Sequence, residues 1–224
     1  MRFQSILAAA VSLLGVVHSA PSLAPRDDIP KDMKPSDDVW RLTQVGQSTR
    51  TPQYAAIKDK EIKEIKDLYL EASKAFNFIK VQDNILTSDT KSALVAAYYN
   101  PKDKTVSVGT IPRQKDVRDD MLNGKTGKVW QAHHKKEGLG STLHAEDLAY
   151  FWNERENPIK LDDDEDPKDY KYGKDEEGSA MVAVWGVKGS NSEAVKEAAG
   201  RPWEQCSGCS KLAKSLGVYM KAPK

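Results

Sequence analysis

The chain is short of cysteine, of long apolar runs and of any excess of one charge. Cys206 and Cys209 are the only cysteines among 224 residues, too few for a disulfide-stapled scaffold. After one N-terminal run, no segment approaches the ~20 consecutive apolar residues of a membrane-spanning helix. The 34 basic residues nearly balance the 33 acidic ones, which excludes the overall positive field of a dedicated duplex-binding protein. No Asn-x-Ser/Thr motif occurs, so N-glycosylation is not expected.

Residues 1–19 have the features of a secretory signal peptide. Arg2 supplies the charged start, Ile6 to Val17 form the apolar run, and Val17-His18-Ser19 resembles a small-residue cleavage site. We expect cleavage after Ser19, with Ala20 as the alternative. The protein is therefore expected to be secreted and soluble, with no membrane partner.

The remaining chain divides into an arm and one domain. Residues 20–53 carry prolines among charges and few apolar side chains, a composition typical of a disordered arm or pro-segment. Residues 54–224 are long enough to form a domain with its own hydrophobic core.

Apolar spacing predicts the elements of this domain. A period of three to four predicts a helix over residues 54–79, and Ala93 to Tyr99 with Thr105 to Ile111 predict a hairpin that turns at Pro101. The elements expected after the hairpin are, in order, an irregular basic loop (112–143), a helix (144–154) capped by Ser141 or Thr142, an acidic loop (157–178), a buried strand (179–187), a helix that Pro202 opens and Gly217 ends, and a last strand (218–220).

Two short motifs place metal-binding side chains near expected helix starts. They are His144-Ala145-Glu146 and, about sixty residues later, Cys206-Ser207-Gly208-Cys209. At a helix start, cysteines three apart share one face of the first turn, where free backbone N–H groups favour the thiolate that binds metal. A catalytic zinc ion typically takes three protein ligands. His144, Cys206 and Cys209 would supply them, and Glu146 would be free to move protons.

These motifs resemble the His-x-Glu and Pro-Cys-x-x-Cys signature of the zinc-dependent cytidine and deoxycytidylate deaminase superfamily. The chain departs from it at Pro202, which stands four residues before Cys206 and not directly before it. The resemblance covers roughly residues 55–220, and the predicted order of elements agrees with it. It implies an α/β fold, a three-layer α/β/α sandwich around a central mixed sheet. It also implies Zn²⁺ as the cofactor and Glu146 as the catalytic residue.

The resemblance implies a secreted zinc-dependent hydrolytic deaminase that acts on a nucleobase in a nucleoside, nucleotide or single-stranded nucleic acid. Cytosine and adenine both remain open. An exported chain with a long loop before the His-x-Glu helix is similar to the deaminase domains of exported toxins. Two alternatives also remain: a non-catalytic secreted effector that keeps the fold for binding, and a thiol-redox protein that uses the Cys-x-x-Cys pair.

Each candidate residue also has a purely structural interpretation. His144 could be a packed core histidine, Glu146 a first-turn carboxylate that stabilises the helix dipole, and Cys206 with Cys209 a disulfide. A disulfide that closes four residues contributes about 2 kcal/mol in the chain-entropy model, whereas a structural zinc contributes on the order of 10 kcal/mol. Stability therefore favours the metal.

Two further residues are candidates for substrate contact. His134, with His133 beside it, lies in the basic segment and could contact a phosphate or stack on a base, a solvated loop being the alternative. Trp203 could line a pocket or belong to the core.

Overall fold

A computed structural model describes residues 34–35, 55–57, 61–83, 92–112, 115–188, 200–204 and 206–221. The expected signal peptide (1–19) lies outside this set. Of the expected arm (20–53), only Lys34–Pro35 is described, as strand β1. In these ranges, no helix has both the length and the apolar character that crossing a membrane requires.

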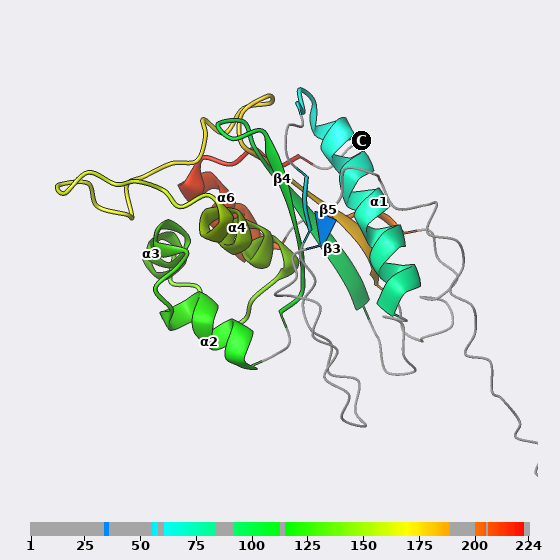
Figure 1. Ribbon diagram of the computed structural model, residues 1–224, viewed down its shortest axis with the longest axis horizontal. Coiled ribbons are helices and arrows are strands. Elements are labelled where there is room, and N and C mark those ends of the chain that lie inside the picture. The colour runs from blue at the N-terminus through cyan, green and yellow to red at the C-terminus, as the bar shows by residue number, and fades with distance from the viewer. Residues whose placement is uncertain are drawn as a thin grey trace, which may run out of the picture.

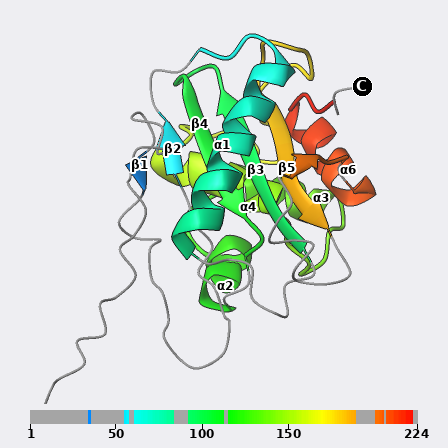
Figure 2. The ribbon, with the colours of Figure 1, turned by 90° about the vertical axis from the view of Figure 1, so that its right-hand side faces the viewer.

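The domain is an α/β structure with helices on both faces of one sheet (Figure 1). The strands are β1 (Lys34–Pro35), β2 (Ala55–Ile57), β3 (Ser92–Asn100), β4 (Thr105–Thr110), β5 (Met181–Lys188) and β6 (Arg201–Pro202), and they lie in the order β1-β2-β4-β3-β5-β6. The helices are α1 (Ile65–Asp83), α2 (Lys115–Asn123), α3 (Lys128–Lys136), α4 (Ala145–Glu156) and α6 (Ser207–Leu216). Among the described helices, α1 covers one face of the sheet, and α2, α3, α4 and α6 lie on the opposite side (Figures 1 and 2).

Strand β3 is buried on both faces, so it reads as a continuous apolar run and not as an alternating one. Val95 and Ala97 belong to the core beneath α1, together with Phe76 of that helix. Ala96 and Tyr98 belong to the second core, which packs against α4. A strand covered on both sides buries consecutive side chains, which explains the apolar run over Val95 to Tyr99. Each core therefore lies between the sheet and the helices that cover one of its faces.

The expected mixed sheet is wrong for the main strands, because every pairing among β1 to β6 is antiparallel. Strands β4 and β5 run in the same direction, but each pairs with β3, which lies between them. The one parallel pairing in the described ranges is an isolated bridge between Met181 and Tyr219. It lies where the sequence predicted a last strand (218–220).

Helices α2 (Lys115–Asn123) and α3 (Lys128–Lys136) lie within the predicted irregular loop (112–143), and residues 137–143 are irregular as expected. Gly124 and Gly127 lie between the two helices, and Gly138 follows α3. Gly127, at the start of α3, has a φ of 69°, and a Cβ there would overlap the Phe151 ring. The Glu154 carboxylate accepts hydrogen bonds from the backbone N–H groups of Val129 (2.8 Å) and Trp130 (3.0 Å). The free N–H groups at the start of α3 are therefore satisfied by a side chain of α4. No pattern within the α3 sequence itself reveals this.

Two predicted helix starts are also displaced. The first helix begins at Ile65, and Ala55–Ile57, which the sequence placed in this helix, form β2 and pair with β4. Pro202 does not open a helix: it lies in β6 opposite Trp185, and α6 begins at Ser207. The hairpin, the strand β5 and the helix end at Gly217 are confirmed.

Helix α4 lies directly against β4 at Gly109. A Cβ at this position would lie 2.6 Å from the carbonyl oxygen of Ala145 and 2.6 Å from the backbone nitrogen of Ala149. Ala145 follows His144, so the glycine sets how closely the start of α4 approaches the sheet.

We expect Gly109→Ala to lower the free energy of unfolding by about 1–3 kcal/mol, because the added methyl group pushes the helix from the sheet. Gly140→Ala is the matched control, since a Cβ at Gly140 meets no atom within 4 Å. Urea denaturation measures both variants. Equal stability of the two variants would contradict the close packing.

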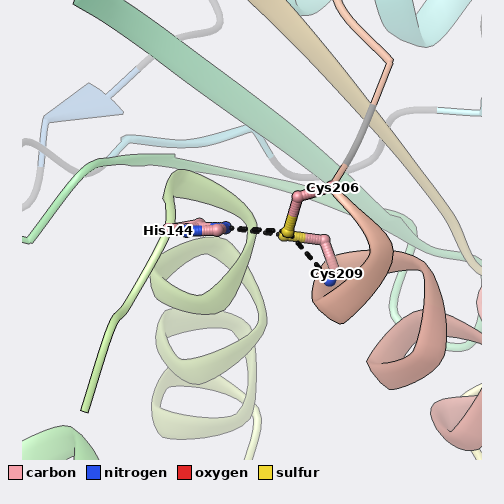
Figure 3. A group of neighbouring side chains, drawn as sticks. All are labelled: His144, Cys206 and Cys209. Carbon is pink, nitrogen blue, oxygen red and sulfur yellow. Dashed lines mark hydrogen bonds between the residues drawn. The ribbon is translucent and has the colours of Figure 1, made fainter. Parts of the chain in front are cut away.

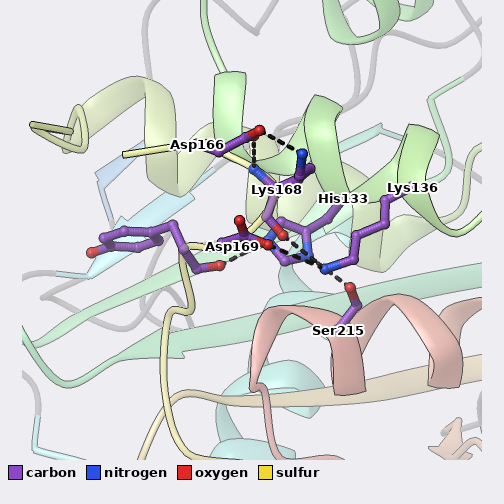
Figure 4. A network of polar contacts seen from close by, with 7 residues as sticks. His133, Lys136, Asp166, Lys168, Asp169 and Ser215 are labelled. Carbon is purple, nitrogen blue, oxygen red and sulfur yellow. Dashed lines mark hydrogen bonds and ion pairs between the residues drawn. The ribbon is translucent and has the colours of Figure 1, made fainter. Parts of the chain in front are cut away.

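His133 ties three segments of the chain together (Figure 4). Its ring lies 2.7 Å from the Ser215 hydroxyl of α6 and 2.7 Å from the backbone oxygen of Tyr170. Nearby, Lys136 donates to the backbone oxygen of Lys168 and pairs with Asp169. His133, which the sequence assigned to a solvated loop, is therefore fully buried and connects α3 to α6 and to the segment around Tyr170.

Burial lowers the pKa of the His133 ring from its ordinary 6.5, so the folded protein favours the neutral ring. The stability that this ring contributes is present above its unfolded pKa and is lost as the pH falls through the lowered folded value. His133→Gln does not titrate, so we expect its free energy of unfolding to fall less than that of the wild type between about pH 7.5 and about pH 5. Urea titrations at both pH values test this, and identical pH dependence in the two proteins would contradict it.

Candidate metal centre

The starts of α4 and α6 bring an imidazole and two thiols together (Figure 3). Nδ1 of His144 lies 2.8 Å from Sγ of Cys209 and 3.3 Å from Sγ of Cys206, and the two sulfurs are 3.0 Å apart. Three ligand atoms from two segments about sixty residues apart therefore form one compact group, which can hold a metal ion.

Both motifs occupy helix caps, which explains how they are positioned. Cys206 is the N-cap of α6, and its sulfur accepts a hydrogen bond from the backbone N–H of Cys209 at 3.3 Å. His144 is the N-cap of α4, in place of the predicted Ser141 or Thr142. The Asp147 carboxylate accepts from the backbone N–H of His144 at 2.7 Å. Asp147 thus completes the N-terminal cap of α4.

The donor set suits a zinc ion. One imidazole nitrogen with two thiolate sulfurs is a set that zinc takes in catalytic sites. Both cysteines are free thiols, and their 3.0 Å separation exceeds the ~2.05 Å of a disulfide bond. Two Zn–S bonds of about 2.3 Å at a tetrahedral angle place the sulfurs about 3.8 Å apart. The side chains would therefore need to open by less than about 1 Å.

Three buried acidic groups lie at or beside the ligand atoms: Cys209, Glu146 and Asp147. Burial raises the pKa of the Cys209 thiol well above its ordinary value, and the carboxylate of Glu146 raises it further. Burial also raises the pKa of Glu146, against the opposing effect of the His144 ring and the Cys209 thiol, and raises that of Asp147 to about 7. These raised pKa values mean that each group favours its protonated, neutral form. A bound divalent cation would lower the three pKa values, because it favours the charged form of every acid around it.

A cavity of about 170 Å³ adjoins the three ligand atoms. Besides the ligands, its lining includes His134, Leu139, Thr142, Asp147 and Gly208. A Cβ at Gly208 would lie 3.3 Å from Leu139 and 3.7 Å from the Cys206 sulfur, so glycine at this point of the Cys-x-x-Cys motif keeps the cavity open.

The predicted site residues fall into two groups. His144, Cys206, Cys209 and His134 all line the cavity. Glu146 is not among the lining residues: it is 5% exposed and interacts with the Cys209 thiol from within the first turn of α4.

Trp203 lies away from the metal cavity. Its indole N–H donates to the backbone oxygen of Gly186 at 2.7 Å, and the Arg201 guanidinium covers its ring. The structure therefore supports the core interpretation of this residue. Asp147 also lines the cavity, which the sequence did not predict. Its position in the first turn beside Glu146 was the one available signal.

Comparisons of the chain with protein-family models, with curated proteins and with solved structures gave no match.

Proposed function

We propose that the protein is a secreted zinc-dependent hydrolytic deaminase that acts on a nucleobase. The observation that carries the proposal is the meeting of His144 with Cys206 and Cys209 at two helix starts, beside a buried Glu146 and a cavity. The order of the elements also supports it: a helix, a hairpin, the His-x-Glu helix, a strand and the Cys-x-x-Cys helix occur in the implied order, with α2 and α3 inserted after the hairpin and the two-residue β6 before the last helix.

In this proposal His144, Cys206 and Cys209 hold the zinc ion. When bound, zinc lowers the pKa of a water molecule toward neutrality. Hydrolysis replaces an exocyclic amino group by the water's oxygen as a carbonyl, so one proton of the water must reach the ring nitrogen and the other the departing ammonia.

Glu146 is the group for this transfer. Burial raises the pKa of its carboxyl group, which brings its affinity for a proton closer to what a general acid and base needs near neutral pH. The first turn of α4 fixes it next to the metal ligands, and Asp147 satisfies the helix cap. Glu146 is therefore available to take up a proton and deliver it again.

Three measurements on reduced, metal-replete protein test the proposal: zinc per chain, free thiols, and ammonia release from cytidine, adenosine and single-stranded nucleic acid. We expect one zinc, two thiols released only after metal removal, and ammonia from at least one substrate. A protein that binds zinc but releases no ammonia would be a zinc-containing binding protein and not a deaminase. A Cys206–Cys209 disulfide without zinc would replace it by a thiol-redox protein. Mass spectrometry of exported protein would show whether its chain starts at Ala20.

A further inference from the structure

A second, larger hollow adjoins the metal cavity. This groove has a volume of about 770 Å³, and His134 and Leu139 line both spaces. Helix α3 and the end of α2 supply most of its lining, and Pro167 of the acidic loop contributes as well. Helices α2 and α3 lie on the far side of α4 from α1 (Figure 1). The two spaces are therefore neighbours, with His134 and Leu139 between them.

His134 is buried without a polar partner. Its side chain is 3% exposed, and in the described part of the chain no hydrogen bond reaches its ring nitrogens. The ring lies against Trp130, with centroids 4.8 Å apart. Its ring nitrogens are not among the fully enclosed unpaired polar atoms of the described residues, so they are open to the adjoining spaces. Because His134 lines both spaces, a ligand that spans them can supply the missing hydrogen bond.

The groove carries positive charge. Lys128 and Lys135 lie on its edge, both exposed, and no acidic side chain belongs to its lining. Neither lysine forms an ion pair with a described residue, in contrast to Lys136, which pairs with Asp169. Two unpaired ammonium groups beside an open groove attract an anionic group such as a phosphate.

We propose that the substrate carries phosphate, as a nucleotide or a nucleic-acid strand does and a free nucleoside does not. The base occupies the metal cavity and contacts His134, and a phosphate lies in the groove between Lys128 and Lys135. The inference rests on the proposed function for the place of the base and adds the class of substrate.

Binding of defined probes to the zinc-loaded full chain tests this. The probes are cytidine, adenosine, their 5′-monophosphates and a fluorescein-labelled single-stranded DNA of mixed sequence. We expect phosphate-bearing probes to bind at least about tenfold more tightly than nucleosides, a difference of about 1.4 kcal/mol. Monophosphates as tight as the strand identify a free nucleotide as the source of the phosphate, and a strand that binds more tightly identifies nucleic acid.

Lys128→Gln with Lys135→Gln removes the two charges, and we expect it to abolish the preference for phosphate without changing nucleoside binding. For the strand, the slope of log Kd against log salt falls by about 1.4, since each single-strand phosphate contact contributes about 0.7. Lys63→Gln with Lys66→Gln is the matched control, because these exposed lysines adjoin α1 on the opposite face. His134→Phe keeps an aromatic ring and is expected to weaken all probes.

Any of three results would overturn the inference. They are equal affinity for nucleosides and nucleotides, an equal loss of affinity for phosphate-bearing probes in the two double-lysine variants, and no binding of any probe. Its failure can be told from failure of the proposed function. Lysine-dependent binding without ammonia release leaves the inference standing and overturns the deaminase. Ammonia release from nucleosides and nucleotides with equal kcat/KM leaves the deaminase standing and overturns the inference about phosphate.

Discussion

Replacement of Cys209 by serine is expected to abolish stoichiometric zinc binding. Cys209 is the buried member of the ligand group, 6% exposed, and its sulfur lies within 3.0 Å of both other ligand atoms. Loss of second-shell partners alone lowers metal affinity by 10–100-fold, so loss of a ligand should exceed about 100-fold. Competition with a chromophoric chelator measures the affinity.

Ser210→Ala is the control for this prediction. Ser210 follows Cys209 in α6 and is exposed, so its replacement leaves the ligand set intact. We also expect chelation to lower the thermal stability of the wild type and of Ser210→Ala, but not of Cys209→Ser, because only the first two bind zinc in the folded state. Unchanged zinc affinity in Cys209→Ser would remove this residue from the site.

The second large effect is expected at Glu146. Glu146→Gln keeps the size of the side chain and removes its ability to take up a proton, so we expect kcat/KM for ammonia release to fall by about 10²–10⁴-fold. The neutral amide also removes a buried acid, so no loss of thermal stability is expected. Zinc affinity should change far less than in Cys209→Ser, because Glu146 is not a ligand.

Glu156→Gln serves as the matched control, since Glu156 is an exposed carboxylate at the other end of α4. Ammonia release by the two variants is compared under saturating zinc. A Glu146→Gln protein as active as this control would assign the proton transfer to another group. Asp147, which lines the cavity, would then be the next residue to replace.

The sequence predicted those parts of the fold that local periodicity determines. The apolar side chains from Val95 to Tyr99 are buried on both faces of β3, and the turn at Pro101 joins this strand to β4 as expected. The meeting of the two motifs was expected from the resemblance, whereas the helix caps at His144 and Cys206 that position them were not predicted.

The parts that the sequence did not predict depend on contacts between distant residues. Helix α3 was missed because its capping acceptor, Glu154, lies about twenty-five residues further along the chain. Pro202 suggested a helix start, but its pairing with Trp185 draws it into the sheet. The burial of His134 follows from the same helix, since a loop would have left that ring in solvent.

X-ray absorption at the zinc edge tests the central claim most directly. For reduced full-length protein purified with zinc, the account predicts one ion per chain, with two sulfur ligands at about 2.3 Å and one imidazole nitrogen at about 2.0–2.1 Å. Protein that retains no zinc under these conditions, or an ion whose ligand shell contains no sulfur, would contradict it.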